Sequence, residues 1–202
     1  MKSVEAGRSH AAPVSGHPRT PVAPRAPLQW IAAFRAGYAP WFETARPLVE
    51  RHDYAAAFKT YPWPTFIESP WTELEKPLAS ARLAVVTTGG LYRPGVDRPF
   101  DGDAPEGDAS YRAIPRETAL ATLGIAHPHF AHEVARADMN TIFPLERLEE
   151  LVRAGALGDL APTHYSTMGY ATDAARLAET TAPAIAARMR EEGVDAALVV
   201  PV

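Results

Sequence analysis

Two short, uninterrupted apolar runs constrain the fold of this chain more than any other feature. Residues 82–88 read Arg-Leu-Ala-Val-Val-Thr-Thr before Gly89 and Gly90, and residues 196–200 read Ala-Ala-Leu-Val-Val. Such runs, without alternating polar residues, are typical of strands that are buried on both faces of a parallel sheet covered by helices. The sequence therefore predicts an α/β fold with a mainly parallel sheet and flanking helices in Rossmann-like layers.

Helical patterns accompany these two runs. Residues 144–154 place leucines on one face and charged side chains on the other, which predicts an amphipathic helix. A second helix is expected over about 172–193, with a bend at Pro183. The other predicted segments are a long loop over 93–110, a helix over 115–123 and a short strand over 124–126.

Three regions are expected along the chain. Residues 1–27 are rich in Pro, Ala and Arg and lack apolar periodicity, so we predict a flexible, disordered extension. Residues 28–80 form an aromatic-rich arm, in which Pro40 and Pro47 predict short helices joined by turns rather than one long helix. The aromatic side chains of the arm either pack on the core or form a subunit contact. Residues 81–202 are the α/β domain.

We expect this α/β domain to be incomplete at its C-terminus. Only Pro201 and Val202 follow the strand over 196–200, although open α/β sheets build their sites from the loops after such strands. Two clear strands and one weak strand are also fewer than a covered parallel sheet usually contains. Either something else completes the sheet, or the chain is the front part of a longer product.

Charge and composition exclude several classes of protein. The 20 basic and 24 acidic side chains provide no basic field for a nucleic acid. The absence of Cys excludes disulfides, zinc–thiolate sites, iron–sulfur ligation and cysteine catalysis by the chain as written. The chain has no apolar run of about eighteen residues and no apolar signal segment, so we expect a cytoplasmic protein without a membrane partner.

The segment after the first apolar run carries side chains suited to ligand binding. Thr87, Thr88, Gly89 and Gly90 follow a buried strand, so their amides and hydroxyls lie where a sheet can bind a small anion at its carboxyl edge. The alternative is a simple tight turn.

The densest imidazole cluster contains His127, His129 and His132, and His164 follows later in the chain. These rings suit proton transfer or substrate contact, structural hydrogen bonding or, as a distant alternative, a metal-dependent hydrolase. No Asp or Glu lies between His127 and His132, so we expect no metal. Residues 162–170 concentrate hydroxyls in a predicted turn and suit helix capping, since no G-x-S-x-G pattern marks a serine nucleophile.

Several segments occur in an order that matches a known family. They are Leu83–Gly90, Gly107–Arg112, His127–His129, Thr141–Leu145, Leu160–Ser166 with Met168–Tyr170, Glu179–Pro183 and Gly193–Asp195. Together they resemble the selenoprotein B family of glycine, sarcosine, betaine and D-proline reductases. The resemblance covers roughly residues 72–202 and leaves the arm outside it.

The resemblance implies a cytoplasmic oxidoreductase that cleaves a carbon–nitrogen bond of a small amine reductively. In that family a selenocysteine, or in some members a cysteine, attacks the carbon next to the substrate carboxylate and displaces the amine. A pyruvoyl-bearing partner subunit activates glycine or proline substrates, and a thiol or selenol electron-transfer protein resolves the product. We expect no cofactor in this chain itself, and we regard a homo-oligomer as compatible with the sequence.

By the same resemblance, the nucleophile lies just after the strand that ends at Pro201, and therefore beyond Val202. Selenocysteine is encoded by UGA, which ordinary gene reading takes as a stop, so our hypothesis is a chain truncated at its selenocysteine codon. The alternative is a non-catalytic binding or scaffold subunit of the same fold.

The resemblance also assigns expected site residues. His127, His129 and His164 are the candidates for proton transfer, and Arg112 is expected to pair with a carboxylate. The expected substrate contacts are Thr87, Thr88, Gly89, Gly90, Arg112, Tyr165 and Ser166.

Overall fold

The structure, a computed structural model, describes residues 28–66 and 72–202. The flexible extension predicted for residues 1–27 lies outside these described residues. Within them, no helix is both long enough and apolar enough to cross a membrane.

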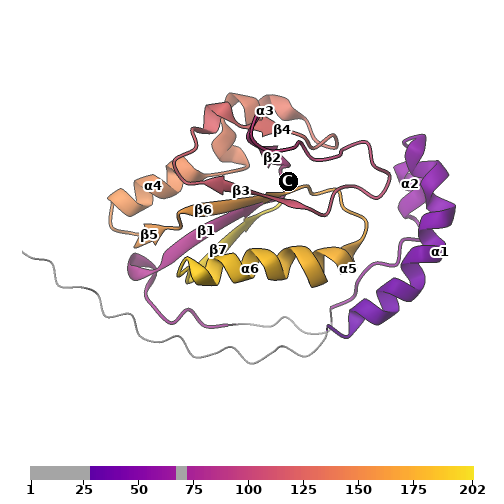
Figure 1. Cartoon of the computed structure of the whole chain (residues 1–202), viewed down its shortest axis with the longest axis horizontal. Helices are drawn as coiled ribbons and strands as arrows, with labels where there is room; N and C mark the ends of the chain where they lie inside the picture. The colour runs from indigo at the N-terminus through magenta and orange to yellow at the C-terminus, as the bar shows by residue number, and fades with distance from the viewer. Residues whose placement is uncertain (1–27, 67–71) are drawn as a thin grey trace, which may run out of the picture.

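One five-stranded mixed sheet forms the centre of the fold (Figure 1). β1 (Arg82–Thr87) pairs in parallel with β5 (Asp159–Leu160) and β6 (Thr163–Thr167) on one side and with β7 (Ala196–Val200) on the other. β3 (Tyr111–Pro115) runs antiparallel to β6 and forms the edge opposite β7. A mostly parallel sheet with β1 at its centre confirms the predicted α/β class.

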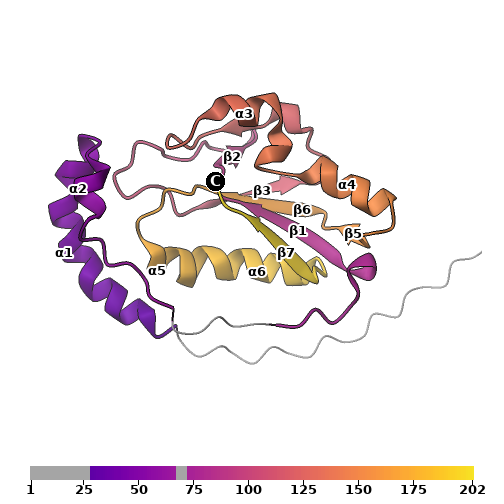
Figure 2. The ribbon, with the colours of Figure 1, turned by 180° about the vertical axis from the view of Figure 1, so that it is seen from behind.

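Helices cover both faces of this sheet, as the two opposite views show (Figures 1 and 2). α3 (His132–Ala137) and α4 (Leu145–Arg153) lie on one face, where α4 buries leucines as its amphipathic pattern predicts. On the other face, α6 (Ala182–Glu191) places Ile185 and Met189 in the core. The sheet is thus a packed layer between two apolar layers.

The remaining elements include a π-helical interruption of the last helix and a small second sheet. α5 (Ala174–Arg176) is followed by a π-helical turn over Leu177–Thr181, and Pro183 lies in the first turn of α6. The helix predicted over 172–193 is thus interrupted by a π-turn that ends two residues before the proline. β2 (Leu91–Tyr92) pairs antiparallel with β4 (Gly124–Ile125), which confirms the short strand predicted there.

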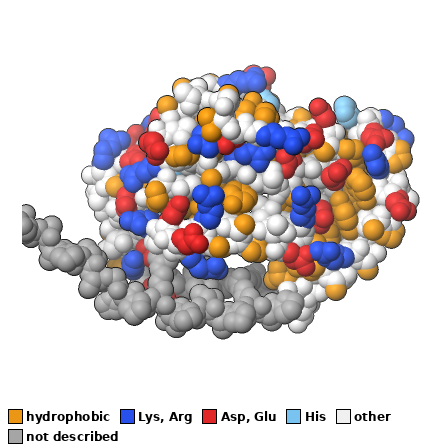
Figure 3. Space-filling view, viewed as in Figure 1, with side chains coloured by type: hydrophobic (Ala, Val, Ile, Leu, Met, Phe, Trp, Pro, Cys, Tyr) orange, Lys and Arg blue, Asp and Glu red, His pale blue; other side chains and the backbone are white. Residues whose placement is uncertain are grey.

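The arm contains one long helix, so the prediction of several short helices is wrong. α1 (Trp30–Glu50) continues through Pro40 and Pro47, and only α2 (Tyr54–Phe58) is short. Each proline costs about 3 kcal/mol inside a helix, but burial of one large apolar side chain returns about 1.5–3 kcal/mol. The buried face of α1, which includes Trp41, therefore outweighs both interruptions. Hydrophobic side chains on the viewed surface gather over α1 and α2 (Figure 3).

Two local predictions were wrong in secondary structure. Residues 115–123 contain the end of β3 and a single 3-10 turn over 120–122 instead of a helix. Residues 163–167, predicted as a turn, form strand β6 because their Thr and Tyr side chains suit a sheet. The helix after this strand is capped by Asp173, whose side chain accepts from Arg176 N at 3.0 Å, and not by the hydroxyls.

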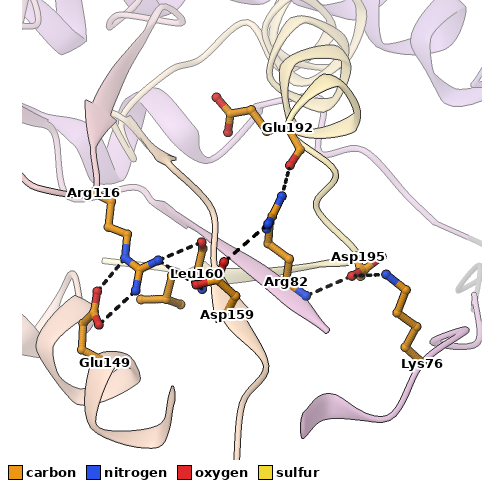
Figure 4. Close-up of polar contacts among 8 residues, drawn as sticks. All are labelled: Lys76, Arg82, Arg116, Glu149, Asp159, Leu160, Glu192 and Asp195. Carbon is orange, nitrogen blue, oxygen red and sulfur yellow. Dashed lines mark hydrogen bonds and ion pairs between the residues drawn. The ribbon is translucent and has the colours of Figure 1, made fainter. Parts of the chain in front are cut away.

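An ion-pair network closes the amino end of the sheet (Figure 4). Arg116 donates to both carboxylate oxygens of Glu149, at 2.7 and 3.1 Å, and to Asp159 at 2.8 Å. Arg82 joins Asp159 to Asp195 on β7's side of the sheet. A surface cavity of about 490 Å³ lies here, but its charged lining groups largely pair with one another. The network therefore ties strands and α4 together rather than forming a binding site.

Candidate active site at the carboxyl end of the sheet

The loop Thr87–Gly90, which follows β1, is hydrogen-bonded to the carboxyl end of β7. Thr88 N donates to Val200 O at 3.0 Å, which continues the pairing of the two strands beyond β1. Val202 N donates to Thr88 Oγ1 at 2.8 Å. The Thr88 hydroxyl thus holds Val202 beside the loop, and the C mark in Figure 1 lies at this edge.

The same loop is joined to the end of β6. Gly90 N donates to Thr167 O at 2.9 Å, and Gly169 N donates to Thr88 O at 2.8 Å. Three segments that are far apart in the sequence therefore meet at one edge. This is the edge at which open α/β sheets form their binding sites.

Two glycines allow the backbone to approach His127 closely. Gly90 has a φ of +67°, and a Cβ at this position would lie 2.9 Å from His127 Cβ. A Cβ on Gly169 would lie 2.8 Å from His127 Nε2 and 3.1 Å from Val202 O. A side chain at Gly90 would displace the Cβ and backbone of His127, and a side chain at Gly169 would displace its imidazole, so both positions require glycine.

His127 presents a buried hydrogen-bond donor at this edge. Its side chain is 4% exposed, and its Nδ1 accepts the backbone N–H of His129 at 3.2 Å. The neutral ring therefore carries its proton on Nε2, which has no hydrogen-bond partner among the described residues. Burial, with His129 and His132 nearby, lowers the pKa of His127 to about 4, so the ring stays neutral at physiological pH.

His129 is exposed and packed between aromatic rings. Its ring centroid lies 4.4 Å from that of Tyr170 and 5.1 Å from that of Tyr54 on α2. Tyr170 is itself fixed, because its hydroxyl donates to Pro105 O at 2.8 Å. Partial burial, and secondarily His52, lowers the pKa of His129. His129 is therefore an oriented imidazole that solvent can reach.

The third clustered histidine has a structural position. His132 Nε2 lies 2.6 Å from His127 O, and its Nδ1 lies 3.3 Å from Arg136 Nη2, so both ring nitrogens are engaged. Within residues 28–66 and 72–202, no three His, Asp or Glu side chains converge as metal ligands would. The metal-dependent hydrolase therefore gains no support from the geometry.

The structure separates His164 from the other histidines. It lies fully buried on β6, its Nδ1 accepts Val85 N–H at 3.0 Å, and its ring packs edge-on to Phe143. Burial, with Arg116 as a second cause, lowers the pKa of His164 to about 4. This histidine lies in the core between β1 and β6, and its Nε2, like that of His127, has no hydrogen-bond partner among the described residues.

Three of the expected substrate contacts have polar groups directed to the fold. Thr87 Oγ1 accepts Gly89 N–H at 3.1 Å, and Ser166 Oγ accepts Leu91 N–H at 2.7 Å. Tyr165 is fully buried on the α6 face of the sheet. Thr87 and Ser166 thus hold the backbone of the loop after β1, whereas Tyr165 is part of the core under α6.

The guanidinium of Arg112 is also engaged in hydrogen bonds within the fold. It donates to Arg98 O at 2.7 Å, to Pro99 O at 3.2 Å and to Ser110 Oγ at 2.8 Å, and its guanidinium lies 4.1 Å from the centre of the Phe100 ring. Its donors thus anchor the long loop over 93–110 to β3 and leave little capacity for a substrate carboxylate.

Sequence reasoning missed three residues of this site. Gly169 and Tyr170 lie in a recognised segment, but nothing in the sequence indicates that they contact His127 and His129. Tyr54 belongs to the arm, more than seventy positions away, and no local pattern relates it to a histidine. The only available signal was the high density of aromatic residues in the arm.

Comparisons with known proteins extend over this site and into the arm. The family described as glycine/sarcosine/betaine reductase selenoprotein B matches residues 48–201. The chain is 32% identical over 128 residues to D-proline reductase subunit gamma of Acetoanaerobium sticklandii, a match that covers 63% of this chain and 51% of that protein. It is 30% identical over 139 residues to glycine reductase complex component B subunit gamma of Symbiobacterium thermophilum, covering 68% of this chain and 32% of that protein.

A third relative has a different named substrate. Betaine reductase complex component B subunit beta of Peptoclostridium acidaminophilum is 34% identical over 128 residues, or 59% of this chain and 28% of that protein. The chain thus spans about half the length of the D-proline reductase subunit and about a third of the glycine reductase subunit. No solved structure matches the chain significantly. The matched region covers most of the chain and all of the site except Val202, and the chain belongs to the glycine/sarcosine/betaine reductase selenoprotein B family.

Proposed function

We propose that this chain is a subunit of a selenoprotein B type reductase that cleaves a carbon–nitrogen bond of glycine, sarcosine, betaine, D-proline or a related small amine. The observation that carries the proposal is the position of His127 Nε2–H, which is buried beside Val202 at the carboxyl edge of the sheet and has no hydrogen-bond partner among the described residues. A buried donor without an acceptor costs about 1–3 kcal/mol. His164 Nε2 also has no partner among the described residues but lies in the core, so it is the place of His127 at the sheet edge that supports a functional use.

The nucleophile of this proposal follows Val202 in the complete enzyme. Thr88 holds Val202 N–H, and His127 Nε2 and Val202 O both lie close to Gly169. A selenocysteine or cysteine at the next position would therefore begin its side chain at the carboxyl edge, within reach of a neutral N–H donor. Hydrogen bonding to an anion favours the anionic form, which is the reactive one.

The chemistry supplied there would be a displacement. The selenolate or thiolate bonds to the carbon beside the carboxylate, and the electron pair of the carbon–nitrogen bond leaves with the amine. A dithiol then releases the reduced product and becomes a disulfide. His127 donates to the anion without changing protonation, because its pKa lies near 4. His129, exposed and oriented by its aromatic neighbours, holds the proton that accompanies the departing amine.

The partners in this proposal are other subunits of a reductase complex. The relatives are named as subunits or components of such complexes, which supports assembly with further chains. A pyruvoyl-bearing subunit and a thiol or selenol electron-transfer protein would provide substrate activation and reducing equivalents.

The test uses the complex purified from its native source with a dithiol as reductant. Each of the four substrates is offered, and amine release, or ring opening for D-proline, is measured. His129→Gln should lower kcat about 100-fold or more, whereas His164→Asn should lower stability but keep turnover per folded enzyme. Full turnover of His129→Gln, or no cleavage of the four substrates and of related small amines offered beside them, would show that the proposal is wrong.

A further inference from the structure

The outer side of β7 is a bare sheet edge. β7 pairs with β1 over five residues, from Ala196 to Val200, and no described strand pairs with its other side. Figure 2 shows β7 in front of the other strands, at the border of the sheet. The sequence predicted a strand buried on both faces here, but Val199 is 60% exposed and Leu198 is 37% exposed. That prediction is wrong in this chain because β7 has only one strand neighbour.

Within residues 28–66 and 72–202, this edge lacks the features that protect the edges of self-contained sheets. Edge strands usually carry a charge, a proline or a covering segment that prevents further pairing. β3, the opposite edge, has Arg112 within it and Pro115 at its end, and Arg112 ties a loop to it. β7 contains only Ala, Leu and Val. The two edges of the sheet are therefore unlike, and among the described strands β7 is the one left open to pairing.

The apolar layers on the two faces of the sheet also stop at β7. By register, Leu198 is opposite Val85, which belongs to the core under α3 and α4. Val199 is opposite Val86, which packs against the α6 core. Both layers thus end in a half-covered apolar side chain. A parallel sheet is normally covered on both faces, so one more strand with its helix would complete both layers.

We propose that the open edge of β7 pairs with a further parallel strand of the reductase itself, supplied by polypeptide that the relatives have outside the matched region. The relatives provide the length, since the match covers 51% of the D-proline reductase subunit and 32% of a glycine reductase subunit. The parallel direction follows from β1, β5, β6 and β7, which all run the same way. This inference concerns the sheet and does not depend on the chemistry proposed above.

Amide hydrogen exchange tests the pairing directly. The 202-residue chain and the reductase purified from its native source are compared over the peptide that contains residues 196–200. Amides that face outward from β7 should exchange quickly in the isolated chain and be protected in the native enzyme. Equally fast exchange in both samples would overturn the proposal.

A matched pair of substitutions tests the edge itself. Val199→Lys places a charge on the open edge, and Val134→Lys places one on α3 at a valine that is 65% exposed. Both variants of the isolated chain should keep the unfolding midpoint of the unmodified chain, because both side chains are exposed. Val199→Lys should reduce the yield of assembled native enzyme more than about tenfold, because a lysine would be buried there. Equal yields of the two variants would contradict the proposal.

Sedimentation velocity distinguishes the proposed strand from a second copy of this chain at the edge of β7. Two copies of this chain could pair their β7 strands across a twofold axis. In that case the isolated chain would form a dimer that Val199→Lys abolishes, and residues 196–200 would become protected as its concentration rises. That result would replace the proposed strand with a second copy. A monomeric isolated chain that is protected only in the native enzyme supports the proposal.

Discussion

Acidification should unfold this chain through two buried histidines. His127 and His164 are 4% and 0% exposed, and burial lowers the pKa of each to about 4 from an ordinary value of 6.5. In the unfolded chain both rings regain the ordinary pKa. Between pH 6.5 and 4 the unfolded state therefore binds more protons, and the free energy of unfolding falls as the pH is lowered.

The size of the effect follows from the two pKa values. A pKa difference of one corresponds to about 1.36 kcal/mol. Each histidine therefore lowers the free energy of unfolding by about 3 kcal/mol as the pH falls from above 6.5 to about 4. Between pH 7.5 and 4.5 the loss is about 2.5 kcal/mol for each ring, or about 5 kcal/mol for both. This is comparable with the whole stability of many domains, which is about 5–15 kcal/mol.

Urea unfolding at several pH values, followed by tryptophan fluorescence, measures this loss. His164→Asn retains an oxygen that can accept Val85 N–H but cannot be protonated, so it should remove about 2.5 kcal/mol of the pH dependence. His52→Asn is the control, because His52 is exposed with φ +63°, a conformation that Asn tolerates. A free energy of unfolding that stays constant from pH 7.5 to 4.5, or an unchanged slope in His164→Asn, would refute the reasoning.

Three further predictions concern the site. Gly169→Ala places a Cβ 2.8 Å from His127 Nε2 and should lower kcat of the complete enzyme about tenfold or more, with the His127 ring signals shifted in NMR spectra. Arg112→Lys should cost about 1–3 kcal/mol of stability and speed proteolysis of the adjoining loop, and a raised KM at unchanged stability would instead restore a substrate role. Tyr54→Leu should raise the pKa of His129 in an NMR titration, whereas Tyr54→Phe should not, because the packing comes from the ring.

The central strands were predictable from the sequence because their residues carry a local signal. The apolar run at residues 82–87 indicates a strand buried on both faces, and β1 has neighbours on both sides. The run at 196–200 has the same composition but lies at an edge. Composition reports the side chains of a strand and not its neighbours, so the exposure of Val199 could not be predicted from it.

The site was predictable in its parts and not in their arrangement. The spacing of His127 and His129 indicated an imidazole cluster, but burial of one ring and exposure of the other depend on how Gly169 and Tyr54 pack against them. His164 carries the same functional group and lies in the core, because the register of β6 turns it toward β1. Residue type alone could not separate these three positions.

The most direct test of the account is the intact mass and selenium content of the protein purified from its native source under reducing conditions. The account predicts a polypeptide heavier than the 21.9 kDa of this chain, with one selenium per polypeptide, or with a cysteine after Val202 in place of selenium. A mass of 21.9 kDa without selenium would contradict it, because no nucleophile would then lie beside His127.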